Sequence, residues 1–145
     1  IVEEAFEVFH FVSDVDLWLV EGDVFGDALF ENPGGHGNNW ITLLLKGTTS
    51  NKSAIGARIK LICTNKNGRE VVFHHIVSTG GSFGSNSLQQ EIGIGKAVAI
   101  KSIEVTWPNR AQTVETFTEI EINRFAKVIE DSGKLEYEDR KQFAF

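Results

Sequence analysis

Residues 57–63 read Ala-Arg-Ile-Lys-Leu-Ile-Cys, and their odd-numbered positions are all small or apolar. Successive side chains of a strand point to opposite faces, so the odd positions are predicted to face a core and Arg58 and Lys60 to face solvent. Residues 65–68 then read Asn-Lys-Asn-Gly, which supplies the positive-φ positions of a tight hairpin turn, and a β-branched run follows over 70–78. This hairpin predicts a sheet with one buried face and one wet face.

The same alternation continues on both sides of the hairpin. Strands are predicted over seven ranges: 40–46, 55–64, 70–78, 87–93, 100–107, 112–118 and 125–130. Seven short strands with Gly- and Asn-rich punctuation are typical of an all-β protein, here an antiparallel β-sandwich. The predicted shared core includes five side chains: Trp40, Ile59, Leu61, Val105 and Trp107. Helix is scarce, and residues 134–143 are expected to form a short helical or irregular tail.

Composition restricts the function classes. The chain has 145 residues and a net charge of −6, and its basic residues are scattered. Phosphate backbones and anionic membranes attract concentrated positive charge, so neither nucleic acid nor a membrane surface is an expected partner. No apolar run approaches the roughly 20 residues of a membrane-spanning helix. Cys63 is the one cysteine, which excludes an internal disulfide and favours a buried, inert thiol.

The first 37 residues have a different character. They contain an acidic aromatic segment over 3–11, a predicted strand over 16–21 and a Gly-rich stretch around Pro33-Gly34-Gly35. We therefore expect three regions: an end segment 1–37 that packs on the main domain, the domain itself over 38–131, and a polar tail over 132–145. Because the chain lacks methionine, we expect it to derive from a longer precursor.

A series of motifs follows in order along the main domain. They are Asn38-Asn39-Trp40-Ile41-Thr42-Leu43, Gly47 with Ser50-Asn51, Ala54-Ile55-Gly56-Ala57-Arg58-Ile59, Gly80-Gly81-Ser82-Phe83 with Ser85, Ile92-Gly93-Ile94-Gly95, and Ile103-Glu104-Val105-Thr106-Trp107-Pro108. Over residues 38–130 they resemble the ASPIC/UnbV family, as found in cartilage acidic proteins and many secreted bacterial proteins. Asn109-Arg110 departs from the small residue and glycine that usually follow the Trp-Pro pair, and the tail beyond Asp131 has no counterpart.

The first region carries a second resemblance. Residues 14–20, Asp-Val-Asp-Leu-Trp-Leu-Val, and residues 28–32, Ala-Leu-Phe-Glu-Asn, are similar to the end of an FG-GAP propeller repeat. ASPIC/UnbV modules commonly follow such repeats, which implies that this chain is the C-terminal part of a longer, secreted protein. FG-GAP repeats often bind calcium, but here only Asp14 and Asp16 remain of the aspartate-rich loop. Either they bind calcium weakly, or they are a solvated or locally hydrogen-bonded pair.

Other candidate chemistry is weak. His74 and His75 are adjacent in a strand, so they point to opposite faces and cannot chelate one metal together. The glycine-rich loop around Ser82 and Ser85 lacks the strand-elbow-helix context of a nucleophile. We therefore expect no enzyme activity and no cofactor apart from the weak calcium candidate.

Loop chemistry points instead to recognition. The candidate ligand-binding residues are Gly81, Ser82, Phe83, Ser85 and Asn86, with support from Asn51. Glycines let the backbone approach a partner, and hydroxyl and amide groups offer adaptable hydrogen bonds. Phe83 is either an exposed stacking platform or a plug that folds back onto the core, and the loops can equally be plain turns.

Two functions follow from these features. The first is a non-catalytic extracellular recognition or adhesion module that binds a protein or a glycan. The second is a structural packing subunit of a larger multi-protein assembly, which uses its aromatic N-terminal segment and its tail as docking arms because so much exposed apolar surface needs a partner.

Overall fold

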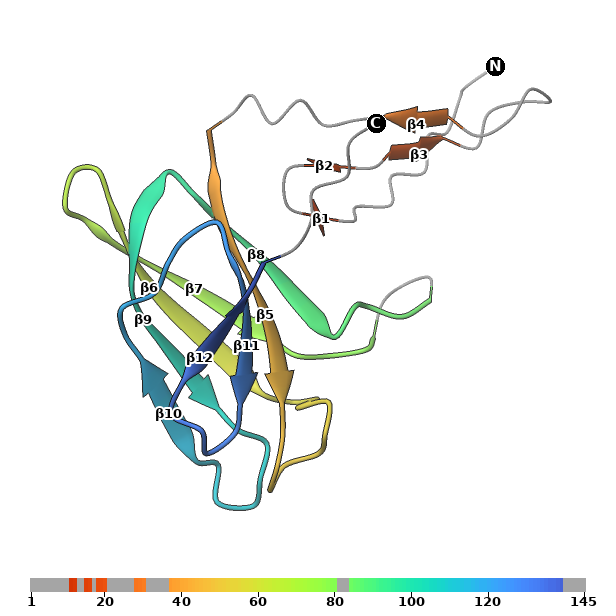
Figure 1. Cartoon of the computed structure of the whole chain (residues 1–145), viewed down its shortest axis with the longest axis vertical. Coiled ribbons are helices and arrows are strands. Elements are labelled where there is room, and N and C mark those ends of the chain that lie inside the picture. Colours follow the sequence, from red (N-terminus) through yellow and green to blue (C-terminus); the bar gives the residue numbers. More distant parts are fainter. Residues whose placement is uncertain are drawn as a thin grey trace. The chain divides into compact units, whose positions relative to one another are not determined.

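A computed structural model of the chain describes residues 37–80 and 84–139, together with the backbone of four short strands between residues 11 and 30. The chain divides into two compact units, 1–37 and 38–145. In the first unit, β1 (Phe11–Val12) pairs with β2 (Val15–Asp16), and β3 (Trp18–Val20) pairs with β4 (Ala28–Phe30), both antiparallel (Figure 1). The strand predicted over 16–21 corresponds to Asp16 and to β3.

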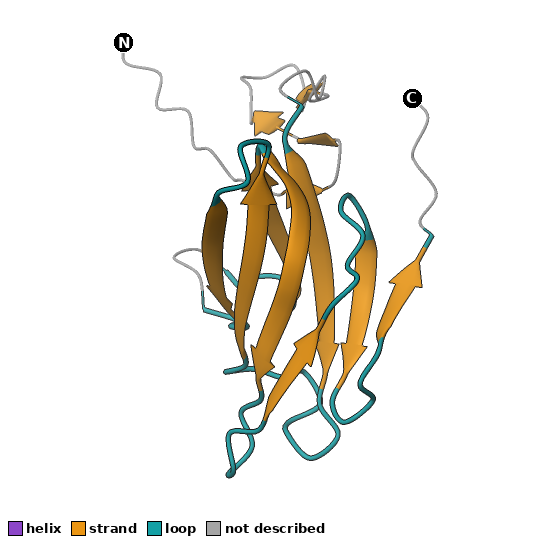
Figure 2. Cartoon of the chain, turned by 90° about the vertical axis from the view of Figure 1, so that its left-hand side faces the viewer, coloured by secondary structure: helices purple, strands orange, loops and turns teal. Residues whose placement is uncertain are grey.

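The second unit consists of two four-stranded sheets. Its strands are β5 (Asn39–Lys46), β6 (Arg58–Asn65), β7 (Glu70–Ile76), β8 (Gln89–Gly95), β9 (Ala97–Thr106), β10 (Val114–Phe117), β11 (Phe125–Ile129) and β12 (Leu135–Glu138). One sheet has the order β10-β9-β6-β7 and the other β12-β11-β5-β8. Figure 2 shows this unit as strands joined by loops. The prediction of an all-β sandwich is confirmed.

Two features of the topology differ from the prediction. All pairings in the two sheets are antiparallel except that of β11 with β5, which is parallel, with Phe125 opposite Thr42 and Ile129 opposite Lys46. The helical or irregular structure expected over 134–143 is wrong for Leu135–Glu138, because these residues form β12 at the edge of the second sheet.

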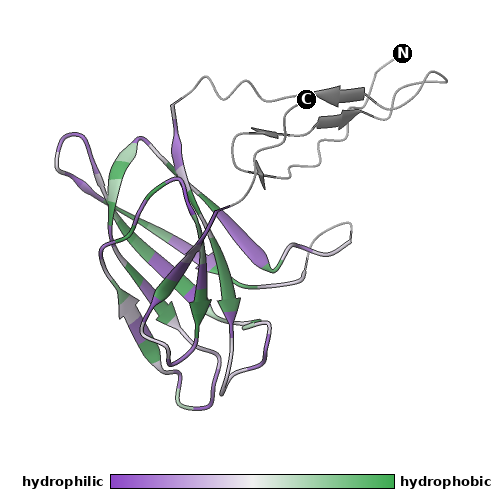
Figure 3. Cartoon of the chain, in the orientation of Figure 1, coloured by the Kyte–Doolittle hydropathy of each residue, from purple (hydrophilic) through white to green (hydrophobic). Residues whose placement is uncertain are grey.

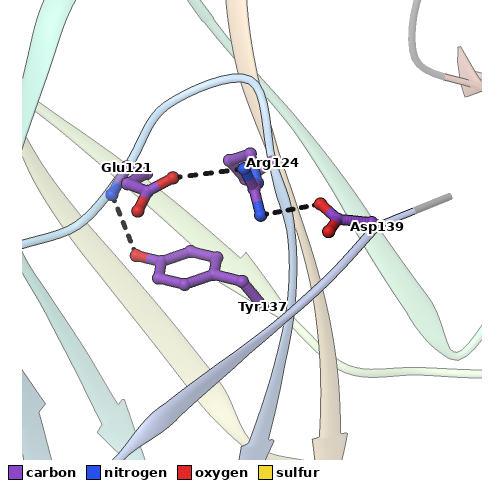
Figure 4. A network of polar contacts seen from close by, with 4 residues as sticks. All are labelled: Glu121, Arg124, Tyr137 and Asp139. Carbon is purple, nitrogen blue, oxygen red and sulfur yellow. Dashed lines mark hydrogen bonds and ion pairs between the residues drawn. The ribbon is translucent and has the colours of Figure 1, made fainter.

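Polar contacts of β12 explain why this polar segment joins the sheet. The Tyr137 hydroxyl accepts a hydrogen bond from the backbone N–H of Glu121 at 2.9 Å, and the Arg124 guanidinium lies 5.4 Å from the centre of the Tyr137 ring (Figure 4). The same guanidinium pairs with Asp139 at 3.0 Å and with Glu121 at 3.4 Å. Leu135 and Tyr137 also pack against the core, so alternate residues of β12 supply both apolar and polar anchors.

The core follows the alternation seen in the sequence. On β6, the odd-numbered residues from Ile59 to Cys63 are buried, whereas Arg58 is exposed. The buried cluster takes apolar side chains from both sheets, and the apolar positions lie along the strands in Figure 3. Trp107 is its largest member and is fully buried. The predicted core positions of Ile59, Leu61, Val105 and Trp107 are therefore confirmed.

Trp40 is the exception among the predicted core residues. Ile41, Leu43 and Leu45 fill the buried face of β5, so Trp40 points to the opposite face and is only half-buried. There its ring meets Phe125 edge-on, with the ring centroids 5.2 Å apart. The prediction for Trp40 is wrong because a one-residue step along a strand reverses the face.

The hairpin turn between β6 and β7 forms as predicted. Gly68 has a φ of 73° and donates its N–H to the Asn65 carbonyl at 3.0 Å. The Asn65 side-chain oxygen also accepts hydrogen bonds from the N–H groups of Asn67 and Arg69. In the part of the chain that the structure describes, no helix has the length and apolar character needed to cross a membrane.

Candidate functional site

Four loops meet at one end of the sandwich. Their described residues are 47–57, 77–80 with 84–88, 107–113 and 130–134, after β5, β7, β9 and β11 respectively. Hydrogen bonds join the first loop to Glu130 and to Val77, and Asn109 of the third loop also bonds to Glu130. We call this region the loop end.

The loop end is organised around a buried carboxylate. Glu130 is only 2% exposed, at the point where the chain leaves β11. Its side chain accepts five hydrogen bonds, from the N–H groups of Thr48 (2.8 Å), Thr49 (2.9 Å) and Ser50 (2.7 Å), the Ser50 hydroxyl (2.7 Å) and the Asn109 amide (2.9 Å). Three successive backbone N–H groups thus surround one anion, as in anion-binding nests.

These donors set the charge state of Glu130. Burial acts to raise the pKa of this carboxyl, but the hydrogen bonds from Ser50, Thr48 and Asn109 outweigh it and lower the pKa from 4.5 to about 2. Glu130 is therefore ionised at neutral pH. Its donors are already engaged, so the 47–53 loop has a structural role around this side chain.

The motif residues of this loop explain its shape. A Cβ on Gly47 would overlap the backbone carbonyl of Asn51, so only glycine fits there. The Asn51 amide closes the loop on itself, because it donates to the Ile55 carbonyl and accepts from the Ile55 N–H, both at 2.9 Å. Gly56 has a φ of 95° and lies against Pro108 of the neighbouring loop. Asn51, a predicted ligand-binding residue, thus has both polar atoms of its side chain bonded within the loop.

Asn109, which departs from the family pattern, contributes to the same arrangement. Its amide nitrogen bonds to both Glu130 and the Thr113 hydroxyl, at 2.9 and 2.6 Å, and its oxygen accepts from the Thr113 N–H at 3.1 Å. Asn109 therefore links the loop after β9 to the end of β11. Nearby, Glu115 accepts a hydrogen bond from the backbone N–H of Asp131.

The loop between β7 and β8 has a different character. Its described residues from Thr79 to Ser87 are all exposed, and we call this segment the arm. An antiparallel bridge between Gly80 and Ser85 closes its base, and Asn86 bonds to the carbonyls of Thr79 and Gly80. The two described ends of the arm are therefore joined to each other by hydrogen bonds.

The described residues include only part of the predicted site. Ser85 and Asn86 lie in the arm, whereas Asn51 belongs to the loop around Glu130. Gly81, Ser82, Phe83 and Asp14 lie outside the described residues, and Asp16 is described only as backbone of β2. The ligand and calcium assignments stay predictions.

Glu130 was not predicted as a site residue. In the sequence it is the last residue of the strand predicted over 125–130, where a charged residue normally marks an exposed end. Its donors Thr48, Thr49 and Ser50 are 80 to 82 positions earlier in the chain and Asn109 is 21 positions earlier, so no local spacing reveals them. One weak signal was available. Gly47 and Ser50-Asn51 form a family-like motif, but nothing in the sequence shows which group its backbone N–H groups bond to.

Other titratable groups provide no second centre. His74 is exposed and His75 half-buried, and burial lowers the pKa of His75. Cys63 is buried as predicted, and burial raises the pKa of its thiol. Within residues 37–80 and 84–139 and the four short strands, no three His, Cys, Asp or Glu residues are grouped to hold a metal ion.

Removal of divalent cations is expected to leave the fold intact. Two aspartates cannot complete the six to eight oxygen ligands of calcium, so EDTA should change the melting temperature by less than about 2 °C. Differential scanning fluorimetry with EDTA and with added calcium measures this. A fall of several degrees that calcium reverses would contradict it and direct attention to Asp14 and Asp16.

Comparison with known proteins gives one match. The family model described as ASPIC and UnbV matches residues 47–135, which include β6 to β11, the start of β12 and all four loops of the loop end. No curated protein and no solved structure matches the chain. The match confirms the family resemblance predicted from the motifs, although it begins after the Asn38–Leu43 motif and extends beyond Asp131 to residue 135. Since it spans more than half of the sequence, this chain belongs to the ASPIC and UnbV family.

Proposed function

We propose that the chain is a non-catalytic extracellular recognition or adhesion module, and that it forms the C-terminal part of a longer, secreted protein with FG-GAP repeats. The family membership supports this setting, because ASPIC/UnbV modules commonly follow FG-GAP repeats. The sequence likeness of residues 14–20 and 28–32 to a propeller repeat supports the second part. Their strands β3 and β4 pair as an antiparallel hairpin, a form compatible with a blade fragment.

The contrast between two polar loops carries the proposal. The 47–53 loop uses its N–H groups and the Ser50 hydroxyl on Glu130, whereas the arm has exposed residues on a hydrogen-bonded base. Loops on a rigid β-scaffold are a common place for binding residues. We therefore propose that the arm contacts the protein or glycan partner, with Ser85 and Asn86 at its described end and Phe83 as the aromatic anchor.

The variant Phe83→Ala tests this role. Wild-type chain is applied to a glycan array and to an array of purified extracellular proteins, and each ligand that binds is then titrated with the variant. We expect affinity to fall at least about tenfold, because aromatic anchors dominate small interfaces. The melting temperature should stay within about 2 °C of the wild type, as for exposed side chains. Val98→Ala, which removes an exposed apolar side chain of β9, is the matched control.

The other outcomes identify competing roles. A large loss of stability in Phe83→Ala would make Phe83 a plug for the core rather than an anchor. Unchanged binding and unchanged melting would remove the arm from the binding surface. If the wild-type chain binds to neither array, the result favours the packing-subunit role. A precursor without a signal peptide or FG-GAP repeats would also support that role.

A further inference from the structure

Strand β7 is an exposed edge with apolar side chains. It is the last strand of the order β10-β9-β6-β7, so only β6 pairs with it among the described strands. Val71, Val72 and Ile76 are 38%, 45% and 59% exposed. Three of the exposed large hydrophobic side chains of the described residues therefore belong to one seven-residue strand.

The hydrogen-bond pattern shows which backbone groups of β7 are free. Asn65 donates to Arg69 and Val77 donates to Ala57, so the odd-numbered residues of this ladder bond to β6. Every second residue in an antiparallel strand turns its N–H and C=O to the other side. The outward groups of β7 therefore belong to its even-numbered residues, Glu70, Val72, His74 and Ile76.

Protective features are missing from this edge. Natural edge strands are commonly short, bulged or interrupted by lysine or proline, which prevents pairing with another chain. The strand β7 reads Glu-Val-Val-Phe-His-His-Ile and pairs with β6 without a bulge in its register. By contrast, the edge strands β10 and β12 have four residues each, and β8 contains two glycines.

We propose that β7 pairs antiparallel with β7 of a second copy of this chain, around a two-fold axis at Val72. In this register Val72 lies opposite Val72 of the second copy, and the even-numbered residues of the two strands exchange their free backbone hydrogen bonds. Val72 already lies beside Ile62 of β6. A row of four apolar side chains then crosses the joint on the outer face of the sheet.

A polar pair across the joint supports this register. Glu70 lies opposite His74 of the second copy, and the two-fold axis repeats the pair on the other side of Val72. His74 ends a row that begins with Glu104 and Lys60, which form an ion pair at 2.9 Å. The Glu70 carboxylate of the second copy thus lies opposite an imidazole that can donate a hydrogen bond to it, while Glu70 itself keeps its ion pair with Lys101 at 2.7 Å.

The inner face matches as well. On this face Phe73 lies beside Leu61, and Val71 lies beside Cys63. Pairing at Val72 sets Phe73 opposite Val71 of the second copy, so both inner rows are apolar and extend the buried face of the sheet. Val71 and the half-buried Phe73 would lose exposed area, which stabilises the dimer.

The register shifted by one residue towards Phe73 fits less well. It centres on Phe73 and also pairs even-numbered residues with each other, but it places Val72 opposite His74 and Glu70 opposite Ile76. Apolar and polar side chains then alternate across the joint on the outer face. Two-fold pairing of β7 in either register closes the assembly, because it leaves only the four-residue strand β10 at each end of the joined sheet.

Two lysine variants of the whole chain test the proposal. Sedimentation velocity over a wide concentration range should show a monomer–dimer equilibrium for the wild type. Val72→Lys places two lysines opposite each other at the axis and should weaken dimerisation at least about tenfold. Val114→Lys, at a side chain 59% exposed on the opposite edge, is the matched control and should dimerise normally. At concentrations where the wild type is monomeric, both should melt within about 2 °C of it, since both sites are exposed.

Charge reversal and crosslinking test the register. Glu70→Lys and His74→Glu should each weaken the dimer, and the double variant should recover it because it again places an acid opposite a hydrogen-bond donor across the joint. Val72→Cys should form an intermolecular disulfide on oxidation faster than Val114→Cys, because the two introduced thiols lie opposite each other at the axis. The native Cys63 is buried and does not compete. A chain that stays monomeric at every concentration, a dimer unaffected by Val72→Lys, or a double variant no better than the single ones would overturn the proposal.

Discussion

Replacing Glu130 with alanine is expected to lower the free energy of unfolding by about 3 to 5 kcal/mol. The substitution leaves the N–H groups of Thr48, Thr49 and Ser50 without their acceptor, and the Asn109 amide loses one of its bonds. Urea unfolding followed by tryptophan fluorescence measures the change. Glu119→Ala, which removes an exposed carboxylate, is the control and should cost less than about 1 kcal/mol. A comparable loss for both variants would contradict the assigned role of Glu130.

The same residue predicts a pH dependence. The pKa of Glu130 is about 2 in the folded chain and near 4.5 when unfolded, so the unfolded state binds a proton more readily. Its stabilising effect is thus complete above about pH 4.5 and is lost as the pH falls towards 2. The glutamine of Glu130→Gln cannot ionise. The free energy of unfolding of this variant should therefore change less than that of the wild type between about pH 5 and about pH 2.5. Equal slopes for the two proteins would contradict the pKa assignment.

Trp107→Ala is the second substitution with a large expected effect, a loss of about 3 to 5 kcal/mol. Trp107 is the largest fully buried side chain and lies at the end of β9, within the cluster shared by both sheets. Its removal leaves a cavity that neighbouring side chains fill only in part. The same urea titration measures it. A loss below about 1 kcal/mol would mean that Trp107 is not a core residue.

Trp107→Phe separates volume from shape. The smaller ring keeps part of the contacts, so its loss should lie between those of the wild type and the alanine variant. The indole N–H has no hydrogen-bond partner among the described residues, so its removal leaves no acceptor unpaired.

Alternation gave most of the fold because it is a local property. Ile59, Leu61 and Cys63 occupy one face of β6 for the same reason that Arg58 occupies the other. The turn at 65–68 was also local, since Gly68 supplies its positive φ angle and the Asn65 side chain accepts hydrogen bonds from Asn67 and Arg69. Trp40 failed because hydrophobic character alone does not decide which face of β5 is buried.

Long-range pairing was the part that the sequence could not reveal. The parallel contact of β11 with β5 joins residues about eighty positions apart, and no local pattern specifies strand order. β12 was missed because its charged residues hide the alternation of Leu135 and Tyr137. The family motifs located the loops correctly, but they did not distinguish the loop that holds Glu130 from the loop whose described residues are exposed.

The central claim is that Glu130 orders the loop end and so makes the 47–53 loop part of the scaffold. NMR-detected hydrogen exchange of backbone amides tests it most directly. The amides of Thr49 and Ser50 lie in a loop, yet they should exchange at least about a hundredfold more slowly than that of Arg110, which has no hydrogen-bond acceptor in its exposed turn. In Glu130→Ala this protection should disappear. Exchange of Thr49 and Ser50 as fast as that of Arg110 in the wild-type chain would contradict the claim.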